Sequence, residues 1–196
     1  MFTGIIDHRA TIISVDVKAQ GMLFGFRTDW NQFKMGESIC VDGVCLTVCG
    51  FRDNEFSAEL SPETLRVSKA GEYRKGTRVN LERSLLLGDP LGGHWVTGHV
   101  DCIGRISGLK SHGDFVELNV SGVAPSFAVK KGSIALDGVS LTINDVYRDE
   151  IGVMLIPHTW ELTNMSDLRI NSPVNIEYDY LAKLVVNQMN ILKGPQ

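Results

Sequence analysis

Residues 38–47 read SICVDGVCLT, and residues 133–142 read SIALDGVSLT. The match continues without a gap from 36–82 onto 131–177, and roughly a third of the positions are identical in this internal repeat. The shared anchors are Ser-Ile, Asp-Gly-Val, Leu-Thr, Pro-x-Thr and Val-Asn-x-Glu. The chain is therefore a duplication of one unit of about 90 residues.

Each copy of the repeat is built from short apolar or alternating runs separated by turn residues. The Asp-Gly pairs at 42–43 and 137–138 predict two-residue hairpins, because Gly readily takes positive φ. Short strands at even spacing predict a small antiparallel barrel in each copy. The stretches SPETL and IPHTW predict a strand end that passes into a brief helical turn with Pro at its start. In the first copy the predicted strands are 38–41, 44–48, 55–60 and 78–82.

A Gly- and Pro-rich segment at 87–93, LGDPLGG, predicts the boundary between the two units. We therefore expect an N-terminal unit over 1–92 and a C-terminal unit over 93–179. After it, an apolar stripe with helical spacing predicts a C-terminal amphipathic helix within 180–196. The stripe leaves two options open, self-association or packing against its own barrel. Its members are Leu181, Val185, Met189 and Leu192.

Composition excludes several classes of function. The 196-residue chain is 43% hydrophobic and 21% charged, with a formal net charge of −4, as in an ordinary soluble globular protein. The basic footprint of a nucleic-acid-binding protein is missing. No run approaches the roughly 18 apolar residues of a membrane span, and the start of the chain has no signal-peptide pattern. We therefore expect a cytoplasmic protein without a nucleic-acid or membrane partner.

The four cysteines, Cys40, Cys45, Cys49 and Cys102, form no CxxC pair and accompany no His cluster with zinc-ligand spacing. We therefore expect reduced thiols and no metal site. One alternative remains open, because Cys40 and Cys45 flank a predicted hairpin turn and could form a disulfide across it.

Seven motifs, in order and with the right spacing, make the chain similar to the riboflavin synthase family. They are MFTGI at the start, GVCLTV at 43–48, SPETLR at 61–66, VNLER at 79–83, GGHxVxGHVD at 92–101, KGSIALDGVSLT at 131–142 and IPHTxExT at 156–163. Three positions depart from the usual pattern. Trp160 stands where Leu is more common, Cys102 replaces a common Gly, and Asp42 stands where Asn is frequent.

The resemblance implies an all-β fold of two similar six-stranded Greek-key barrels with a C-terminal helix that assembles a homotrimer. It implies a dismutation of two molecules of 6,7-dimethyl-8-ribityllumazine, without metal or organic cofactor. One molecule passes a four-carbon unit to the other, giving riboflavin and 5-amino-6-(D-ribitylamino)uracil. In the family the site lies between barrels of neighbouring subunits, whereas the sequence itself leaves open whether the site is completed within one chain.

A short echo of the start, MFTGIID at 1–7 and WVTGHVD at 95–101, places His99 opposite Ile5. The repeat also places Cys45 opposite Ser140. Two similar pockets suit a reaction between two copies of one compound, since holding both rings makes the step effectively unimolecular. The pockets must differ where donor and acceptor differ, so we expect the changed positions to carry the chemistry.

The roles follow from the side chains. His99 is the candidate proton acceptor or relay at the N-terminal barrel, with Cys45 as its polar or acid–base partner. Ser140 and Thr142 would orient or provide a nucleophile at ring position 7 of the donor, and Asp179 could activate Ser140. The alternatives without a role in catalysis are a histidine that only stabilises the fold, a small buried cysteine, and strand hydroxyls that are hydrogen-bonded within the barrel.

The remaining candidates contact the ring and the ribityl chain. The resemblance implies a strand contact by Gly4–Ile6 in the first pocket and by Gly98–Val100 in the second copy. We interpret His94, in the Gly-Gly-His of the linker, as structural. The substrate-binding candidates are Gly4, Ile5, Ile6, Leu46, Thr47, Ser61, Pro62, Glu63, Thr64, Gly98, Val100, Lys131, Leu141, Ile156, Pro157, His158, Thr159, Trp160 and Glu161.

Two other functions are consistent with the same pattern. A non-catalytic lumazine or flavin carrier of this fold would keep the pocket turns and could lose the reactive side chains. A generic duplicated barrel for another small molecule would let its turns diverge, whereas Pro-x-Thr persists in both copies. The presence of Cys45, His99, Ser140 and Thr142 together favours the enzyme.

Overall fold

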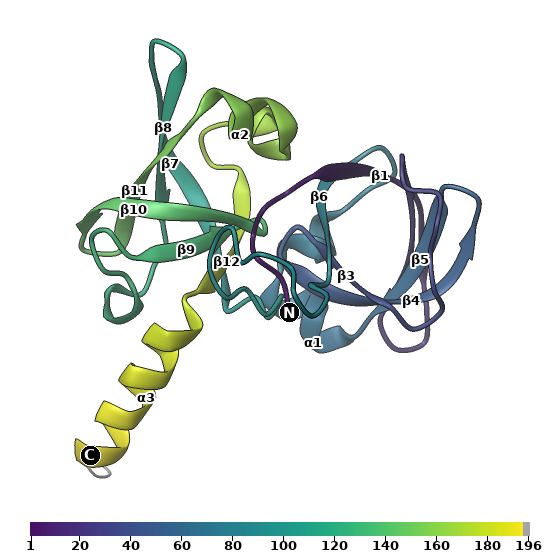
Figure 1. Cartoon of the computed structure of the whole chain (residues 1–196), viewed down its shortest axis with the longest axis horizontal. Coiled ribbons are helices and arrows are strands. Elements are labelled where there is room, and N and C mark those ends of the chain that lie inside the picture. Colours follow the sequence, from purple (N-terminus) through teal and green to yellow (C-terminus); the bar gives the residue numbers. More distant parts are fainter. Residues whose placement is uncertain (194–196) are drawn as a thin grey trace.

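The computed structural model of the chain describes residues 1–193 and consists of two β-barrels side by side, with a helix leaving the second barrel (Figure 1). Each barrel is closed by six antiparallel strands, so the predicted fold class is confirmed. The N-terminal barrel contains β1 (His8–Val17), β2 (Met22–Thr28), β3 (Ser38–Val41), β4 (Val44–Arg52), β5 (Glu55–Leu60) and β6 (Arg78–Arg83). The C-terminal barrel contains β7 (Cys102–His112), β8 (Phe115–Ser121), β9 (Ser133–Leu136), β10 (Val139–Tyr147), β11 (Glu150–Leu155) and β12 (Pro173–Tyr178).

Both barrels have the same strand order. In the first it is β1-β2-β5-β4-β3-β6, and the second repeats it with each number raised by six. The strands β3, β4 and β5 are consecutive neighbours and β6 returns to lie beside β3, which is the Greek-key arrangement. Closure removes every free strand edge from both sheets.

Short helices close the barrels, and one longer helix follows them. The α-helices are α1 (Pro62–Val67), α2 (Pro157–Leu162) and α3 (Tyr180–Lys193), and the 3₁₀ turns are η1 (Lys69–Glu72), η2 (Pro125–Phe127) and η3 (Asn164–Asp167). α1 and α2 begin at the two predicted prolines, where the fixed φ of Pro suits a first helical position. Ser61 caps α1 by accepting a hydrogen bond from the backbone of Thr64, whereas its repeat counterpart, Ile156, gives α2 no such cap.

The Asp-Gly hairpins take positive φ at both turn residues, as a type I′ turn requires. The φ values are 45° and 81° at Asp42 and Gly43, and 47° and 79° at Asp137 and Gly138. The two turns also pack against each other, since a Cβ on Gly43 would lie 2.8 Å from the backbone nitrogen of Gly138. The two barrels therefore meet where equivalent turns of the repeat face one another.

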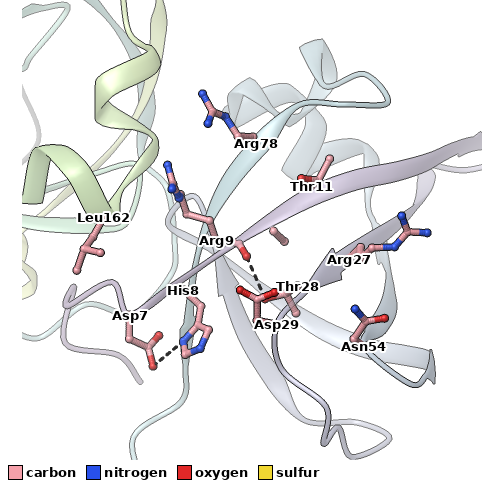
Figure 2. A pocket seen from close by; sticks show the side chains of 11 residues that line it. Asp7, His8, Arg9, Thr11, Arg27, Thr28, Asp29, Asn54, Arg78 and Leu162 are labelled. Atoms are coloured by element: carbon pink, nitrogen blue, oxygen red, sulfur yellow. Dashed lines mark hydrogen bonds and ion pairs between the residues drawn. The ribbon is translucent and has the colours of Figure 1, made fainter.

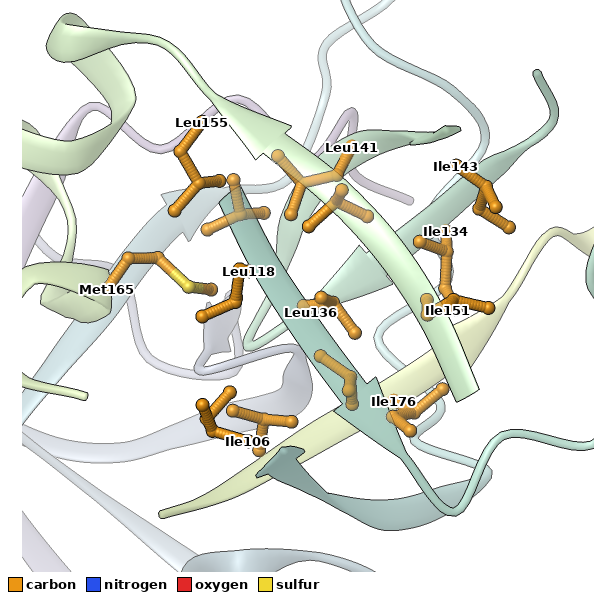
Figure 3. Packing of buried hydrophobic residues seen from close by; sticks show 14 of the residues in the cluster. Ile106, Leu118, Ile134, Leu136, Leu141, Ile143, Ile151, Leu155, Met165 and Ile176 are labelled. Atoms are coloured by element: carbon orange, nitrogen blue, oxygen red, sulfur yellow. The ribbon is translucent and has the colours of Figure 1, made fainter. Parts of the chain in front are cut away.

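The barrels are filled by different side chains. The N-terminal core contains a group of packed aromatic rings, in which Phe26 and Phe56 stack with centroids 4.8 Å apart. Aliphatic residues such as Leu118, Ile134 and Leu136 fill the C-terminal core (Figure 3). The repeat has thus kept strand positions and the inward-facing alternation while exchanging the residues that fill the interior.

α3 does not fold back onto the C-terminal barrel. It leaves the barrel after β12 and points away from it (Figure 1), and none of its residues within 180–193 is buried. The option that the stripe packs against its own barrel is therefore wrong for the described part of the chain. The last three residues of the predicted helical segment, 194–196, lie outside the described residues. Within 1–193, no helix is long and apolar enough to cross a membrane.

The cysteine alternative is also settled. Cys40 and Cys45 are directly opposite each other on β3 and β4, yet all four cysteines are free thiols. The disulfide considered for this pair is therefore absent. Burial, with Glu82 and Glu177 nearby, raises the pKa of the Cys40 thiol well above its ordinary value, so this thiol stays protonated and unreactive.

Candidate functional site

The two echoed segments, MFTGIID and WVTGHVD, form arms that run antiparallel to each other between the barrels. Phe2 donates a backbone hydrogen bond to the carbonyl of Val96 at 2.8 Å, and both side chains are fully buried. Each arm then reaches the barrel of the other repeat. The carbonyl of Gly4 accepts from the backbone N–H of Ser140 at 2.8 Å, and that of Gly98 accepts from Cys45 at 2.7 Å.

A buried glutamate from its own barrel holds each arm in place. Glu82, on β6, accepts from the backbone and hydroxyl of Thr3 at 2.6 and 2.7 Å and from the backbone of Gly4 at 2.9 Å. Glu177, on β12, does the same for Thr97 at 2.7 and 2.6 Å and for Gly98 at 3.0 Å. Burial raises the pKa of both carboxyls, and the donors of the arms oppose that shift. These contacts explain why Thr-Gly and Val-Asn-x-Glu persist together in both copies.

Two positions in the arms require glycine. Gly4 and Gly98 have φ values of 77° and 79°, a region that disfavours a side chain. A Cβ would also lie 2.6 Å from the Cβ of Ser140 at the first position and 2.7 Å from the Cβ of Cys45 at the second. The backbone of each arm is thus pressed against the variable residue of the opposite barrel.

The first pocket, here called the N-terminal pocket, has a cavity of about 270 Å³. β4 supplies Cys45, α1 supplies Glu63 and Thr64, and the second arm supplies the exposed side chain of His99. The full lining is Val44, Cys45, Glu63, Thr64, Val67, Ser68, Gly98, His99 and Val100.

The second pocket, here called the C-terminal pocket, has a cavity of about 180 Å³ and repeats that construction. β10 supplies Ser140, α2 supplies His158 and Thr159, and the first arm supplies Ile5. The full lining is Gly4, Ile5, Ile6, Val139, Ser140, Ile156, His158, Thr159, Leu162 and Thr163.

Each arm therefore serves the pocket of the opposite repeat, which agrees with the expected place of His99 at the N-terminal barrel but not with that of Gly4–Ile6. Gly4–Ile6 were expected in the first pocket but line the C-terminal one, whereas Gly98–Val100 line the N-terminal one. The reason is geometric, because each arm precedes its own barrel and is clamped by that barrel's glutamate, so its free edge faces the other barrel. This exchange brings His99 to Cys45 and Ile5 to Ser140.

The two pockets offer different chemistry within the same frame. The N-terminal pocket presents a thiol, an imidazole and a carboxylate at Cys45, His99 and Glu63. The C-terminal pocket also contains an imidazole, at His158, but it presents the hydroxyl of Ser140 at the position of the thiol and the alkyl side chain of Ile5 at the position of His99. Two rings of the same compound would therefore meet a thiol and an imidazole at these two positions in one pocket, and a hydroxyl and an alkyl side chain in the other.

Several sequence candidates lie outside both linings. Leu46 and Leu141 point into the barrel cores, and Thr47 and Thr142 are exposed on β4 and β10. The other candidates outside the linings are Ser61, Pro62, Lys131, Pro157, Trp160, Glu161 and Asp179. Ser61 acts as the cap of α1, and Trp160 packs partly buried against the C-terminal core.

Asp179 does not hydrogen-bond to Ser140. Its carboxylate accepts from the backbone of Leu181 at 2.8 Å and so begins α3. The partner of Ser140 is His94, whose Nδ1 lies 2.7 Å from the Ser140 Oγ. Interpreting His94 as purely structural overlooked this contact, which the linker sequence did not signal.

Three pairs of lining residues were also overlooked in the sequence. They are Val44 and Val139, Val67 and Leu162, and Ser68 and Thr163. Members of each pair occupy equivalent positions of the repeat. Extending the two helical turns by two residues would have found the last two pairs, whereas Val44 and Val139 immediately precede the candidates Cys45 and Ser140 and carried no signal of their own.

A larger cavity of about 530 Å³ lies between β1, β2 and β6 and the end of α2 (Figure 2). Two of the three arginines that line it are paired, Arg27 with Glu55 at 2.7 Å and Arg78 with Asp167. It contains none of Cys45, His99 or Ser140, and it shares Leu162 with the C-terminal pocket. The larger cavity is therefore a polar surface hollow rather than the candidate site. Among residues 1–193, no three His, Cys, Asp or Glu side chains group as metal ligands.

The fold and the paired pockets define a protein with two lumazine-binding domains. The family model described as the lumazine binding domain matches residues 3–84 and again residues 97–179. The riboflavin synthase of Bacillus subtilis (strain 168) is 38% identical over 187 residues, covering 93% of this chain and 87% of that protein. The riboflavin synthase of Brucella abortus (strain 2308) is 40% identical over 193 residues, covering 93% and 95%. The chain belongs to the riboflavin synthase family.

Solved structures show the same fold at lower identity. LumP complexed with riboflavin superimposes with a TM-score of 0.82 at 20% identity, covering 91% of this chain and 99% of that chain. LumP complexed with 6,7-dimethyl-8-(1'-D-ribityl) lumazine gives a TM-score of 0.79 at 21% identity, covering 90% and 98%.

Proposed function

We propose that this protein is a riboflavin synthase, a transferase that dismutates two molecules of 6,7-dimethyl-8-ribityllumazine. The products are riboflavin and 5-amino-6-(D-ribitylamino)uracil, and the group transferred has four carbons. Several relatives that match nearly the whole chain carry this name, including one from Mycobacterium tuberculosis that is 39% identical over 197 residues. The proposal extends their named activity to this chain.

One observation carries the proposal, namely two equivalent pockets that differ at their reactive positions. Cys45 and His99 in one pocket correspond to Ser140 and Ile5 in the other. A dismutation needs two sites for one compound, and it needs them unequal so that one ring donates and the other accepts. A simple carrier has no use for that difference.

The lining of each pocket suits one half of the reaction. His99 accepts the proton removed from the methyl group at ring position 7, whose anion is delocalised into the pteridine. Cys45 lies in the lining of the same pocket and acts as the acid–base partner of His99. In the C-terminal pocket, Ser140 provides or orients the nucleophile at position 7 of the donor. Hydroxyl and carboxylate groups of α1 and α2 bind the ribityl chain.

The two half-sites belong to neighbouring subunits of a homotrimer in this proposal. Each pocket is smaller than the roughly 300 Å³ at which ligand pockets usually begin, at about 270 and 180 Å³. Joining the N-terminal pocket of one chain to the C-terminal pocket of another would enclose both rings. The reaction then needs no metal or organic cofactor, because alignment of the two rings supplies most of the rate.

Incubation of the purified protein with 6,7-dimethyl-8-ribityllumazine in buffer containing a chelator tests the proposal. Chromatography should show riboflavin and the pyrimidinedione in equal amounts, with two lumazine molecules consumed for each riboflavin. His99→Ala should lower kcat by about 100-fold, the lower end of a general-base contribution. His112→Ala is the matched control, because His112 pairs with Glu117 on an exposed hairpin.

The alternative is a non-catalytic lumazine or flavin carrier, because LumP, which has the same fold, is known in complex with a lumazine and with riboflavin. Stoichiometric binding of the lumazine without any riboflavin would establish the carrier and reject the enzyme. Full turnover by His99→Ala would reject the proton-acceptor role and leave the enzyme intact.

A further inference from the structure

His94 and Ser140 form a buried pair at the edge of the C-terminal pocket. The Nδ1 atom of His94 lies 2.7 Å from Ser140 Oγ, and the histidine is only 7% exposed. Its other ring nitrogen, Nε2, is buried and has no hydrogen-bond partner among residues 1–193. A histidine that serves only packing normally has both ring nitrogens paired or solvated. Within residues 1–193 the other buried side-chain atom without a hydrogen bond is His8 Nδ1, which still lies 3.2 Å from a carboxylate oxygen of Asp7, so the Nε2 of His94 is the more isolated of the two.

The chain is shaped to bring this ring to the serine. The backbone N–H of His94 donates to the carbonyl of Thr3 at 3.1 Å, which fixes the segment against the first arm. At Gly93, a Cβ would lie 2.1 Å from that same carbonyl and 2.8 Å from the Ser140 Cβ. Only glycine allows the backbone to pass this close, and the next residue is then held over Ser140.

The charge of the ring also suits a proton acceptor. Burial lowers the pKa of His94, and the nearby Asp179, at the start of α3, opposes that shift. The ring is therefore neutral near pH 7, so one nitrogen has a free lone pair. Since Nδ1 faces the hydroxyl, the tautomer with hydrogen on Nε2 places that lone pair where the Ser140 hydrogen points.

We propose that His94 is the positioning residue for Ser140, holding the serine hydrogen on Nδ1 and receiving it when Ser140 attacks. This inference rests on the proposed function and names the group that acts on Ser140 in place of Asp179. It gives the C-terminal pocket its own proton acceptor, distinct from His99 in the N-terminal pocket.

The step balances as follows. The Oγ–H bond of Ser140 breaks and its proton passes to His94 Nδ1, while Oγ bonds to carbon 7 of the donor ring. The electron pair of the ring double bond at that carbon moves into the electron-poor pteridine. When the Oγ–C bond later breaks, the imidazolium returns the proton to Oγ, so the pair is restored without an oxidant or a reductant.

His94→Asn tests the proposal, because the Asn amide can occupy the place of Nδ1 and hydrogen-bond to Ser140 but cannot take its proton. We expect kcat to fall about 100-fold with KM changed less than about threefold, as for the loss of one proton acceptor. Ser140→Ala should cause a similar loss, and the double variant should lose no more than Ser140→Ala, because the two groups act as a unit. His112→Asn is the matched control and should retain wild-type rates.

A second measurement does not depend on turnover. Nitrogen-15 NMR of the labelled full-length protein, assigned with His94→Asn, should show the Nε2–H tautomer in the wild type and a mixture of tautomers in Ser140→Ala. Wild-type kcat in His94→Asn, additive losses in the double variant, or an Nδ1–H tautomer would each overturn the proposal. A wild-type protein that binds but never turns over lumazine would reject the proposed function alone, since the NMR result still decides the tautomer.

Discussion

At residue scale, the site depends on backbone positions that are the same in both repeats and on side chains that differ. Gly4 and Gly98 bring equivalent arms equally close to Ser140 and Cys45. Because the backbone frame is constant, the exchange of Cys for Ser and of His for Ile changes the chemistry and leaves the geometry alone. Duplication followed by substitution at these positions therefore yields two unequal pockets at low structural cost.

Gly98→Ala tests the close approach of the arm. We expect the free energy of unfolding to fall by about 1–2 kcal/mol because of the positive φ, and by about 1–3 kcal/mol more because the new Cβ overlaps Cys45. KM for the lumazine should rise, because the arm that carries His99 is pushed away from the N-terminal pocket. Urea unfolding and steady-state kinetics measure the two effects.

Gly76→Ala is the matched control for this change. Gly76 has a φ of 92°, yet a Cβ there would meet nothing within 4 Å. Gly76→Ala should lower the free energy of unfolding only by the contribution of the positive φ, and it should leave KM unchanged. Equal losses in the two variants would show that the contact with Cys45 carries no strain.

At the scale of elements, α3 carries an apolar stripe that no other part of residues 1–193 covers. Leu181, Val185 and Met189 are all more than half exposed, at 55%, 59% and 51%. Its base, in contrast, is tied to the second arm, because Lys183 binds Asp101 at 3.0 Å, two residues after His99. A partner helix on this face would therefore also steady the segment that carries His99.

Val185→Glu should dissociate the proposed trimer, because a carboxylate would be buried in the interface without a partner. We expect the dissociation constant to rise at least about 100-fold, as burying an unpaired charge costs several kcal/mol. Sedimentation of the wild type and the variant over a range of concentrations measures this change. Turnover should fall together with the trimer if the two half-sites belong to neighbouring subunits.

Asn190→Glu is the control, since five residues at 100° each place it on the opposite face of α3 from Val185. A Val185→Glu protein that sediments like the wild type would show that the stripe is not the trimer contact.

At the scale of the whole molecule, a buried polar cluster fixes the two barrels against each other. Lys69 Nζ lies 3.1 Å from Asp42 and 2.5 Å from Asp137, one carboxylate from each barrel. Burial alone would lower the pKa of Lys69, but the two carboxylates outweigh it and raise the pKa. Asn80 and Asn175 extend the cluster, each donating to the hairpin turn of the opposite barrel at 2.9 and 2.7 Å.

Lys69→Met should destabilise the protein by about 3–5 kcal/mol at pH 7.5, because two buried carboxylates lose their cation. Burial, with Asp42 adding to it, raises the pKa of Asp137 to about 7, and Lys69 opposes that rise. An acid whose folded pKa is raised contributes stability at low pH and loses it as the pH rises through that pKa. Without Lys69 the pKa of Asp137 rises further, so more stability is lost between pH 5 and pH 7.5. The free energy of unfolding of the variant should therefore be closer to that of the wild type at pH 5.

Urea unfolding of both proteins at pH 5 and pH 7.5 checks the prediction. Lys130→Met is the control, because Lys130 pairs with Asp145 on the surface with 64% of its side chain exposed. That change should cost less than about 1 kcal/mol at either pH. A Lys69→Met loss that is the same at both pH values would contradict the account of Asp137.

The sequence carried most of the fold because repetition, alternation and turn residues act locally. It predicted β3 and β5 to the residue, the two Asp-Gly hairpins and a C-terminal helix within 180–196, where the structure has α3. It also selected Cys45, His99 and Ser140, since a substitution between equivalent positions stands out against an otherwise constant repeat. Those inferences need only neighbours along the chain or the comparison of one copy with the other.

Tertiary structure alone decided which arm serves which pocket, which group meets Ser140 and what joins the barrels. These contacts pair residues far apart in the chain, such as His94 with Ser140 and Lys69 with Asp137. Nothing in local pattern fixes such pairs, because they depend on how two closed barrels dock. The repeat determined two similar pockets, and the docking of the barrels through their hairpin turns determined that each pocket is built from both halves of the chain.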